Sequence, residues 1–205
     1  MAMVQNRRRP DELSPFEFNL LRNKTFNIIK AKSFALGSYG LASGRHSDYY
    51  LDMKPTMFDP EGLNGLAQMV LHRLATVDVD CVGGLALGAV PLVSAVSMGS
   101  QNTEKPLPGF FVRKEVKDHG TMKLIEGFAR DEDIKGKRVV ILDDVTTTGG
   151  SAMIAVTAAR NAGAKIVLVL SIVDREEGAP QFYEQKGIPF ECFFRASEFK
   201  APATA

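Results

Sequence analysis

The chain has 205 residues, of which 45% are hydrophobic and 24% charged, and its formal net charge is +1. This composition is typical of a globular domain that buries a sizeable core. The nearly neutral balance weighs against a general nucleic-acid binder, which carries a strong basic excess. Apolar runs are too short for a membrane span, and the first residues lack the apolar core of a signal peptide. We therefore expect a cytoplasmic protein with no membrane or nucleic-acid partner.

The N-terminal part of the chain is expected to hold a loose tail, residues 1–13, and a helix over residues 14–32, where apolar residues have helical spacing. The following segment, residues 33–54, is rich in Gly, Ser and Tyr and predicts short strands and turns. A second helix is expected over residues 59–77, because Asp59 is a natural N-cap and the proline after it fits the first helical position.

From Cys81 onward, short apolar runs alternate with helical stretches. The runs cover residues 81–87, 109–112, 138–142, 166–173 and 190–194, and the helical stretches cover residues 90–98, 150–162 and 180–185. Strands that are apolar throughout are typical of a parallel sheet covered on both faces, and the alternation indicates the same. The sequence predicts an α/β fold: a single domain over 14–205, with a small N-terminal hood at 14–58 and a core at 59–198.

The segment VVILDDVTTTGG, residues 139–150, is the leading candidate for a ligand site. Asp143 and Asp144 end a predicted strand, at the edge where open parallel sheets bind ligands. The turn after them opens a helix, whose free N–H groups and positive dipole end attract a phosphate. Carboxylates accept hydrogen bonds from hydroxyls, so the segment suits a phosphorylated sugar. The alternative is a simple helix cap, but a cap needs one residue and this segment supplies several polar ones.

This segment resembles the signature of type I phosphoribosyltransferases, which bind 5-phosphoribosyl 1-diphosphate. The resemblance implies the fold of that family, a central mainly parallel sheet flanked by helices with a small hood. It also implies that Asp143 and Asp144 contact the ribose hydroxyls and that the turn holds the 5-phosphate. The turn residues assigned in this way are Val145, Thr146, Thr147, Thr148, Gly149, Gly150 and Ser151.

A basic segment, FFVRKEVKDHG, covers residues 110–120. By itself, such a segment would most often be a solvent-exposed surface. It resembles the mobile catalytic loop of orotate phosphoribosyltransferases, R-K-x-x-K-x-H-G. The resemblance implies that Arg113, Lys114, Lys117 and His119 bind the diphosphate. Lys117 and His119 are the catalytic candidates, because departure of diphosphate builds negative charge that cations stabilise. It also implies a homodimer, in which the loop reaches the neighbouring subunit's site.

Two hood tyrosines form a candidate base site. SGRHSDYYLDMK, residues 43–54, is similar to the family segment S-G-x-x-S-x-Y-[YF], whose aromatic pair contacts the pyrimidine. The resemblance therefore assigns Tyr49 and Tyr50 to orotate. Without it, two adjacent tyrosines would more often belong to a small core, since aromatic side chains are favoured for buried area.

Arg175, in the segment SIVDREEG, matches the family arginine that pairs with the orotate carboxylate. A guanidinium fork suits a planar carboxylate. The alternative is a surface ion pair with Glu176 or Glu177. Thr147 matches a family threonine that also contacts orotate.

Three positions depart from the family pattern. Ala42 stands where some members carry a lysine, and Leu87 and Gly88 stand where some carry tyrosine and lysine. These departures remove possible diphosphate contacts, and Lys54 is a weak candidate to replace them.

The resemblance implies a pentosyltransferase, an orotate phosphoribosyltransferase. Such an enzyme transfers the 5-phosphoribosyl group from 5-phospho-α-D-ribose 1-diphosphate to N1 of orotate, in the pyrimidine (UMP) pathway. Mg²⁺ is the expected cofactor, carried mostly by the diphosphate, and we expect no dedicated metal site on the protein. Two alternatives stay open: a phosphoribosyltransferase for another base, and a non-catalytic regulator that binds the same diphosphate.

Overall fold

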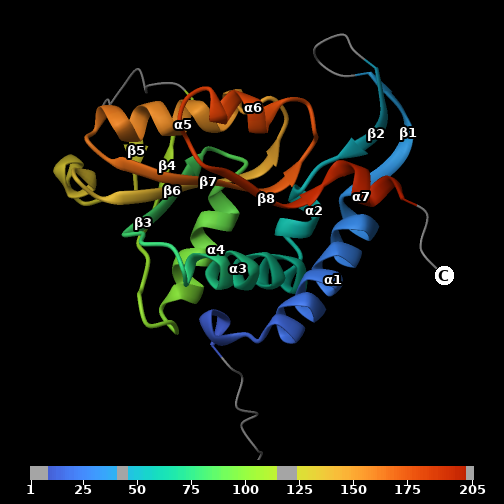
Figure 1. Cartoon of the computed structure of the whole chain (residues 1–205), viewed down its shortest axis with the longest axis horizontal. Coiled ribbons are helices and arrows are strands. Elements are labelled where there is room, and N and C mark those ends of the chain that lie inside the picture. The colour runs from blue at the N-terminus through green and yellow to red at the C-terminus, as the bar shows by residue number, and fades with distance from the viewer. Residues whose placement is uncertain (1–8, 41–45, 115–123, 202–205) are drawn as a thin grey trace, which may run out of the picture.

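The computed structural model describes residues 9–40, 46–114 and 124–201, without the side chains of residues 131 and 132. It consists of a large sheet covered by helices on both faces and a small hairpin that lies beside one end of the sheet (Figure 1). This arrangement confirms the predicted α/β fold with a central parallel sheet and a hood.

The large sheet has the strand order β5-β4-β3-β6-β7-β8, and β3, β4, β6, β7 and β8 are parallel. The strands are β3 (Cys81–Leu85), β4 (Gly109–Val112), β5 (Ile125–Glu126), β6 (Arg138–Thr146), β7 (Lys165–Asp174) and β8 (Phe190–Arg195). β5 is antiparallel to β4 and was not predicted. Two residues are too few to produce a recognisable period in the sequence.

Helices cover both faces of this sheet, as continuous apolar strands require. α3 (Pro60–Leu74) and α4 (Val90–Ser100) lie on one face, and α5 (Gly150–Asn161) and α6 (Ala179–Glu184) lie on the other (Figure 1). The N-cap predicted for α3 is confirmed, because the Asp59 side chain accepts a hydrogen bond of 2.8 Å from the Gly62 N–H. The sheet thus separates two hydrophobic cores, one under each helical layer.

The hood contains α1 (Pro15–Lys32), the antiparallel pair β1 (Phe34–Gly40) and β2 (His46–Leu51), and the short helix α2 (Lys54–Met57). Ser14 begins α1 with a capping box, and a 3-10 turn, η1 (Pro10–Glu12), precedes it inside the segment expected to be a tail. Another 3-10 turn, η2 (Asp131–Ile134), leads into β6.

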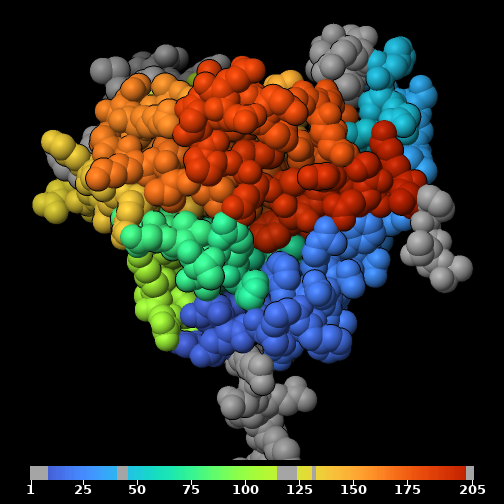
Figure 2. All heavy atoms as spheres, viewed as in Figure 1, coloured from blue at the N-terminus to red at the C-terminus, as the bar shows by residue number. Residues whose placement is uncertain are grey.

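The last helix, α7 (Ala196–Lys200), returns to the hood from the end of β8. Its Phe199 is buried and stacks on Phe26 of α1, with ring centroids 4.5 Å apart. Figure 2 shows the C-terminal segment filling the surface between the core and α1. α7 therefore joins the hood to the core, in addition to the packing of α1 on α3, and the sequence did not predict this contact of α7.

Candidate active site

The predicted phosphate turn and Arg175 lie side by side at the carboxyl edge of the sheet. β6 extends through both aspartates to Thr146, beyond its predicted end, because Thr146 pairs with Asp174 of β7. The Arg175 N–H donates a hydrogen bond of 2.9 Å to the Thr146 carbonyl oxygen. The structure thus brings together two segments that the sequence assigned separately, one to the sugar phosphate and one to the base.

Asp143 and Asp144 lie on opposite sides of the sheet edge, as successive residues of a strand must. Asp143 is buried, and its negative charge acts on the buried Tyr183 of α6. Asp144 is half-buried and feels the charge of Lys54 from the hood. A Cβ at Gly88 would lie 2.7 Å from Asp144 Oδ1, so the turn after β3 also approaches this carboxylate. Asp144 therefore faces the open side of the site, whereas Asp143 faces the core.

Burial raises the pKa of Asp143 to about 7, because a charged carboxylate is poorly solvated there. The hydrogen bond of 2.7 Å that the Thr146 hydroxyl donates to Asp143 Oδ2 opposes this increase, and the charge of Asp144 adds to it. Burial also raises the pKa of Asp144. Thr146 is itself buried, so its hydroxyl stabilises the turn from below and is directed to Asp143.

The turn after β6 exposes the beginning of α5. Thr148, Gly150 and Ser151 are exposed, and Thr147 is half-buried, as a phosphate cradle requires. Gly149 has φ +91°, which favours glycine, and its carbonyl oxygen accepts a hydrogen bond of 2.8 Å from the hydroxyl of Tyr183. The turn is therefore held in shape from below, while its upper side is open to an anion.

A chain of polar groups from the hood lies near Asp144. The Lys54 ammonium donates a hydrogen bond of 3.0 Å to Asp52 Oδ1, and the Tyr50 hydroxyl approaches Asp52 Oδ2 at 3.4 Å. The Asp52 hydrogen bond raises the pKa of Lys54, and the charge of Asp144 adds to it. Lys54 is thus a cation close enough to Asp144 to interact with it. Of the two positions where some family members carry a lysine, Ala42 lies outside the described residues and Gly88 has no side chain.

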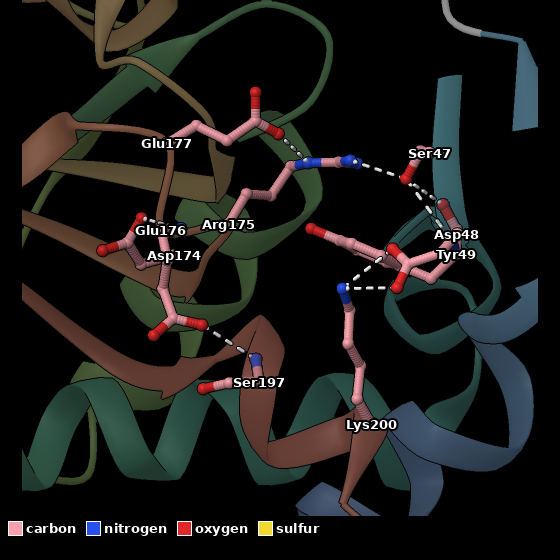
Figure 3. Close-up of polar contacts among 9 residues, drawn as sticks. All are labelled: Ser47, Asp48, Tyr49, Asp174, Arg175, Glu176, Glu177, Ser197 and Lys200. Carbon is pink, nitrogen blue, oxygen red and sulfur yellow. Dashed lines mark hydrogen bonds and ion pairs between the residues drawn. The ribbon is translucent and has the colours of Figure 1, made fainter. Parts of the chain in front are cut away.

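Arg175 lies beside strand β2 of the hood hairpin (Figure 3). Its Nε donates a hydrogen bond of 2.9 Å to Glu177 Oε1, and its Nη2 lies 3.4 Å from Ser47 Oγ. Its guanidinium carbon is 4.6 Å from the centroid of the Tyr49 ring. The expected alternative, an ion pair with Glu177, is thus present together with a contact to the predicted base site.

Tyr49 and Tyr50 point to different sides of β2. Tyr49 is 5% exposed and packs against Phe34, whereas Tyr50 is 49% exposed and lies near Tyr39. Both tyrosines were predicted to contact the base, but the strand places their rings in different environments. A cavity of about 480 Å³ lies beside Tyr49 and Arg175. Its lining residues include Ser47, Asp48, Glu176, Glu177, Ser197 and Lys200.

The basic segment after β4 is described only at its beginning. Arg113 is half-buried, and its Nε donates a hydrogen bond of 3.0 Å to Glu126 Oε1 of β5. Lys114 is exposed. Lys117 and His119, the predicted catalytic residues, lie outside the described residues. The structure therefore places the start of this segment at the sheet edge, where β4 ends.

Sequence reasoning missed several residues that build the site. Tyr183 is 34 positions from the glycine whose carbonyl it binds, and Lys200 is 152 positions from its partner Asp48. Contacts over such separations leave no local spacing in the sequence, so a single sequence carries no signal for them.

The acidic groups of this edge have the chemistry that Mg²⁺ prefers, because that ion is bound through one or two carboxylates together with substrate phosphates. Asp52 is close enough to Asp144 for its charge to act on that carboxyl. Among the described residues, no cluster of three or more His, Cys, Asp or Glu side chains forms a metal cage. These donors fit an ion that arrives with a phosphorylated substrate.

No helix in the described part of the chain is long and apolar enough to cross a bilayer. The parallel sheet, the acid pair and the phosphate turn define a phosphoribosyltransferase of the type I fold. A sequence model of the phosphoribosyl transferase domain matches residues 63–191, which is more than half of the chain.

Several known proteins resemble most of the chain. The orotate phosphoribosyltransferase of Rhodopseudomonas palustris (strain BisB5) is 51% identical over 87% of this chain and 95% of its own length. The orotate phosphoribosyltransferase of Synechocystis sp. is 39% identical over 88% of this chain and 89% of its own length. The crystal structure of Mycobacterium tuberculosis H37Rv orotate phosphoribosyltransferase in complex with 5-phospho-α-D-ribosyl 1-diphosphate superposes with a TM-score of 0.73 at 28% identity, covering 88% of this chain and 99% of that one. The chain belongs to the orotate phosphoribosyltransferase family.

Proposed function

We propose that this chain transfers the 5-phosphoribosyl group from 5-phospho-α-D-ribose 1-diphosphate to N1 of orotate. The products are orotidine 5′-monophosphate and diphosphate, and the reaction belongs to UMP synthesis. The observation that carries the proposal is the junction of the phosphate turn with Arg175, where the Arg175 N–H lies 2.9 Å from the Thr146 carbonyl oxygen. Membership of the orotate phosphoribosyltransferase family supports the choice of base.

The sugar phosphate binds along the turn after β6. The N–H groups of the turn and of the first residues of α5, residues 147–151, hold the 5-phosphate at the positive end of the helix. Asp144 accepts hydrogen bonds from the ribose hydroxyls, because it faces the open side. Asp143 belongs to the same ribose site, but its buried carboxyl acts mainly by holding Thr146 and so the turn.

Orotate binds between the turn and the hood. Arg175 pairs with the orotate carboxylate, because a guanidinium has five N–H donors and the two hydrogen bonds of its side chain leave others for a ligand. Tyr50 and Thr147 contact the pyrimidine, and Tyr49 supports the guanidinium from below. Orotate loses its N1 proton without a dedicated base, so positioning and electrostatics carry the reaction.

The basic loop handles the leaving group. Arg113, Lys114, Lys117 and His119 bind the diphosphate, and Lys117 and His119 stabilise or protonate it as the glycosidic bond to it breaks. When bound together with the diphosphate, Mg²⁺ would neutralise part of the diphosphate charge, and Asp144 and Asp52 are the carboxylates that would lie near it. Closure of the loop excludes water from the reactive sugar carbon.

A homodimer with shared sites follows from the loop resemblance. Mixing Lys117→Ala with Asp144→Asn, each inactive alone, restores part of the activity if the loop acts in the neighbouring subunit, since hybrid dimers then contain one intact site. The absence of any recovery from a mixture that exchanges subunits would contradict shared sites. The cytoplasmic location stays a prediction from the sequence.

The assignment of orotate is tested by following its ultraviolet absorbance with 5-phosphoribosyl 1-diphosphate and Mg²⁺ present. We expect wild type to consume orotate and Arg175→Gln to raise the KM for orotate about 10- to 100-fold, the value of a lost charged hydrogen bond. Arg73→Gln is a matched control, because Arg73 donates two hydrogen bonds of 2.6 Å to Glu191 away from the site. It should leave the kinetics unchanged.

Two outcomes would contradict the assignment. Turnover of uracil or a purine that survives Arg175→Gln would show a different base, because neither base has a carboxylate for the arginine. Binding of the diphosphate substrate without turnover of any base would show a regulator instead of an enzyme.

A further inference from the structure

The C-terminal helix α7 contacts the hood and the Arg175 loop at the same time. The N–H of Ser197, in its first turn, donates a hydrogen bond of 2.9 Å to Glu176 Oε2, next to Arg175. Lys200, in its last turn, donates to both carboxylate oxygens of Asp48, at 2.8 and 3.0 Å. Because Phe199 anchors the helix in the hydrophobic core, Lys200 is held at a defined place.

Lys200 and Arg175 both lie on the ring of Tyr49. The Lys200 ammonium is 4.3 Å and the Arg175 guanidinium carbon 4.6 Å from the ring centroid. In Figure 3 the guanidinium reaches the ring from above in the view and the ammonium from below. Two cations from distant parts of the chain therefore share one aromatic platform, and both line the cavity of about 480 Å³.

Asp48 is hydrogen-bonded to Lys200 and lies within the electrostatic field of Arg175. The Lys200 hydrogen bond is the main cause that lowers the pKa of Asp48, and the field of Arg175 adds to it. Arg175 Nη2 lies 3.4 Å from Ser47 Oγ, so its guanidinium reaches the residue next to Asp48. Without the Lys200 ammonium, an ionised Asp48 would attract Arg175 and compete with an anionic ligand for it.

We propose that Lys200 is a positioning residue for the base site: its ammonium neutralises Asp48, which keeps the guanidinium of Arg175 available for the substrate carboxylate. This inference rests on the proposed pairing of Arg175 with orotate. It concerns a residue outside both the matched domain, residues 63–191, and the segments that carry the family resemblance.

The test is Lys200→Met, which keeps the apolar stem on Tyr49 and removes the charge. We expect the KM for orotate to rise about 3- to 10-fold, while kcat and the KM for 5-phosphoribosyl 1-diphosphate stay within about twofold of wild type. Lys200→Arg keeps the positive charge and should therefore have the wild-type KM for orotate. Lys186→Met is the matched control, because the Lys186 ammonium lies 4.8 Å from the centroid of the Phe182 ring and Lys186 does not line the cavity beside Tyr49 and Arg175.

A second variant separates charge neutralisation from simple anchoring. If Asp48 competes for Arg175, Asp48→Asn alone stays near wild type, and Asp48→Asn added to Lys200→Met restores the KM for orotate. If Lys200 only anchors the hood through Asp48, both single variants and the double variant are equally impaired, which would overturn the inference. Lys200→Gln replaces Lys200→Met should the latter fail to fold.

The inference and the proposed function fail in different ways. An unchanged KM for orotate in Arg175→Gln would refute the role of Arg175 itself. A raised KM in Arg175→Gln together with an unchanged KM in Lys200→Met would refute only the role of Lys200. In the Arg175→Gln background, Lys200→Met should have no further effect, because it acts through that arginine.

Discussion

The buried carboxyl of Asp143 predicts that the site lowers the stability of the fold. In the folded protein its pKa is about 7, against an ordinary value of 3.8. Between these two values the folded protein holds a proton that the unfolded chain has released. The contribution of Asp143 to the free energy of unfolding therefore falls as the pH rises from about 4 to about 7, and is constant above that range.

Asp143→Asn removes this loss, since the amide has no charge and its oxygen still accepts the hydrogen bond from Thr146. The difference between 3.8 and about 7 corresponds to about 4 kcal/mol. Relaxation of the charged side chain toward water reduces this amount, so we expect the variant to be more stable than wild type by about 2 kcal/mol at pH 8. The gain should shrink steadily toward pH 4.

Urea unfolding of both proteins at several pH values between 5 and 8, with a chelator and without substrate, measures this difference. Asp59→Asn is the control, because Asp59 has a lowered pKa in the folded state. The Asp59 charge stabilises the fold above about pH 4. Asp59→Asn should therefore lower the free energy of unfolding, whereas Asp143→Asn should raise it. A gain for Asp143→Asn that is independent of pH, or a loss of stability, would refute the reasoning.

Three further predictions concern the support of the site. Gly149→Ala should lower the free energy of unfolding by about 1–3 kcal/mol, and the melting temperature with it, because φ is +91° and a Cβ would lie 2.8 Å from the Phe182 ring. Gly136→Ala is the control and should cost less, because Gly136 has φ +76° but open space around it. Tyr183→Phe should cost about 1 kcal/mol in urea unfolding, because it removes one of the two hydrogen bonds that the Gly149 carbonyl oxygen accepts and leaves the one from the Met153 N–H; an unchanged midpoint would contradict this. Burial raises the pKa of Cys81 to about 11, so in a Cys192→Ser background its thiol should react with a disulfide reagent at pH 8 only as fast as the protein opens; rapid labelling of that native variant would show the burial to be wrong.

The sequence by itself determined the fold class and the place of the acid pair and the turn at the end of a strand. Continuous apolar strands alternating with helices predicted the parallel sheet, and Asp59 predicted the start of α3. The acid pair and the glycine-ended turn predicted the anion site, because strand, carboxylates and turn are contiguous in the chain. Local order and residue chemistry were sufficient for these features.

Only the tertiary structure decided how the site is divided and supported. It placed Asp143 toward the core and Asp144 toward the hood, and so separated two residues that look equivalent in the sequence. It also placed Tyr183 under the phosphate turn and Lys200 beside Arg175. These contacts join residues that are distant in the chain, and burial and pKa depend on what surrounds a group in space. No pattern within one sequence contains that information, because it arises only when the layers pack.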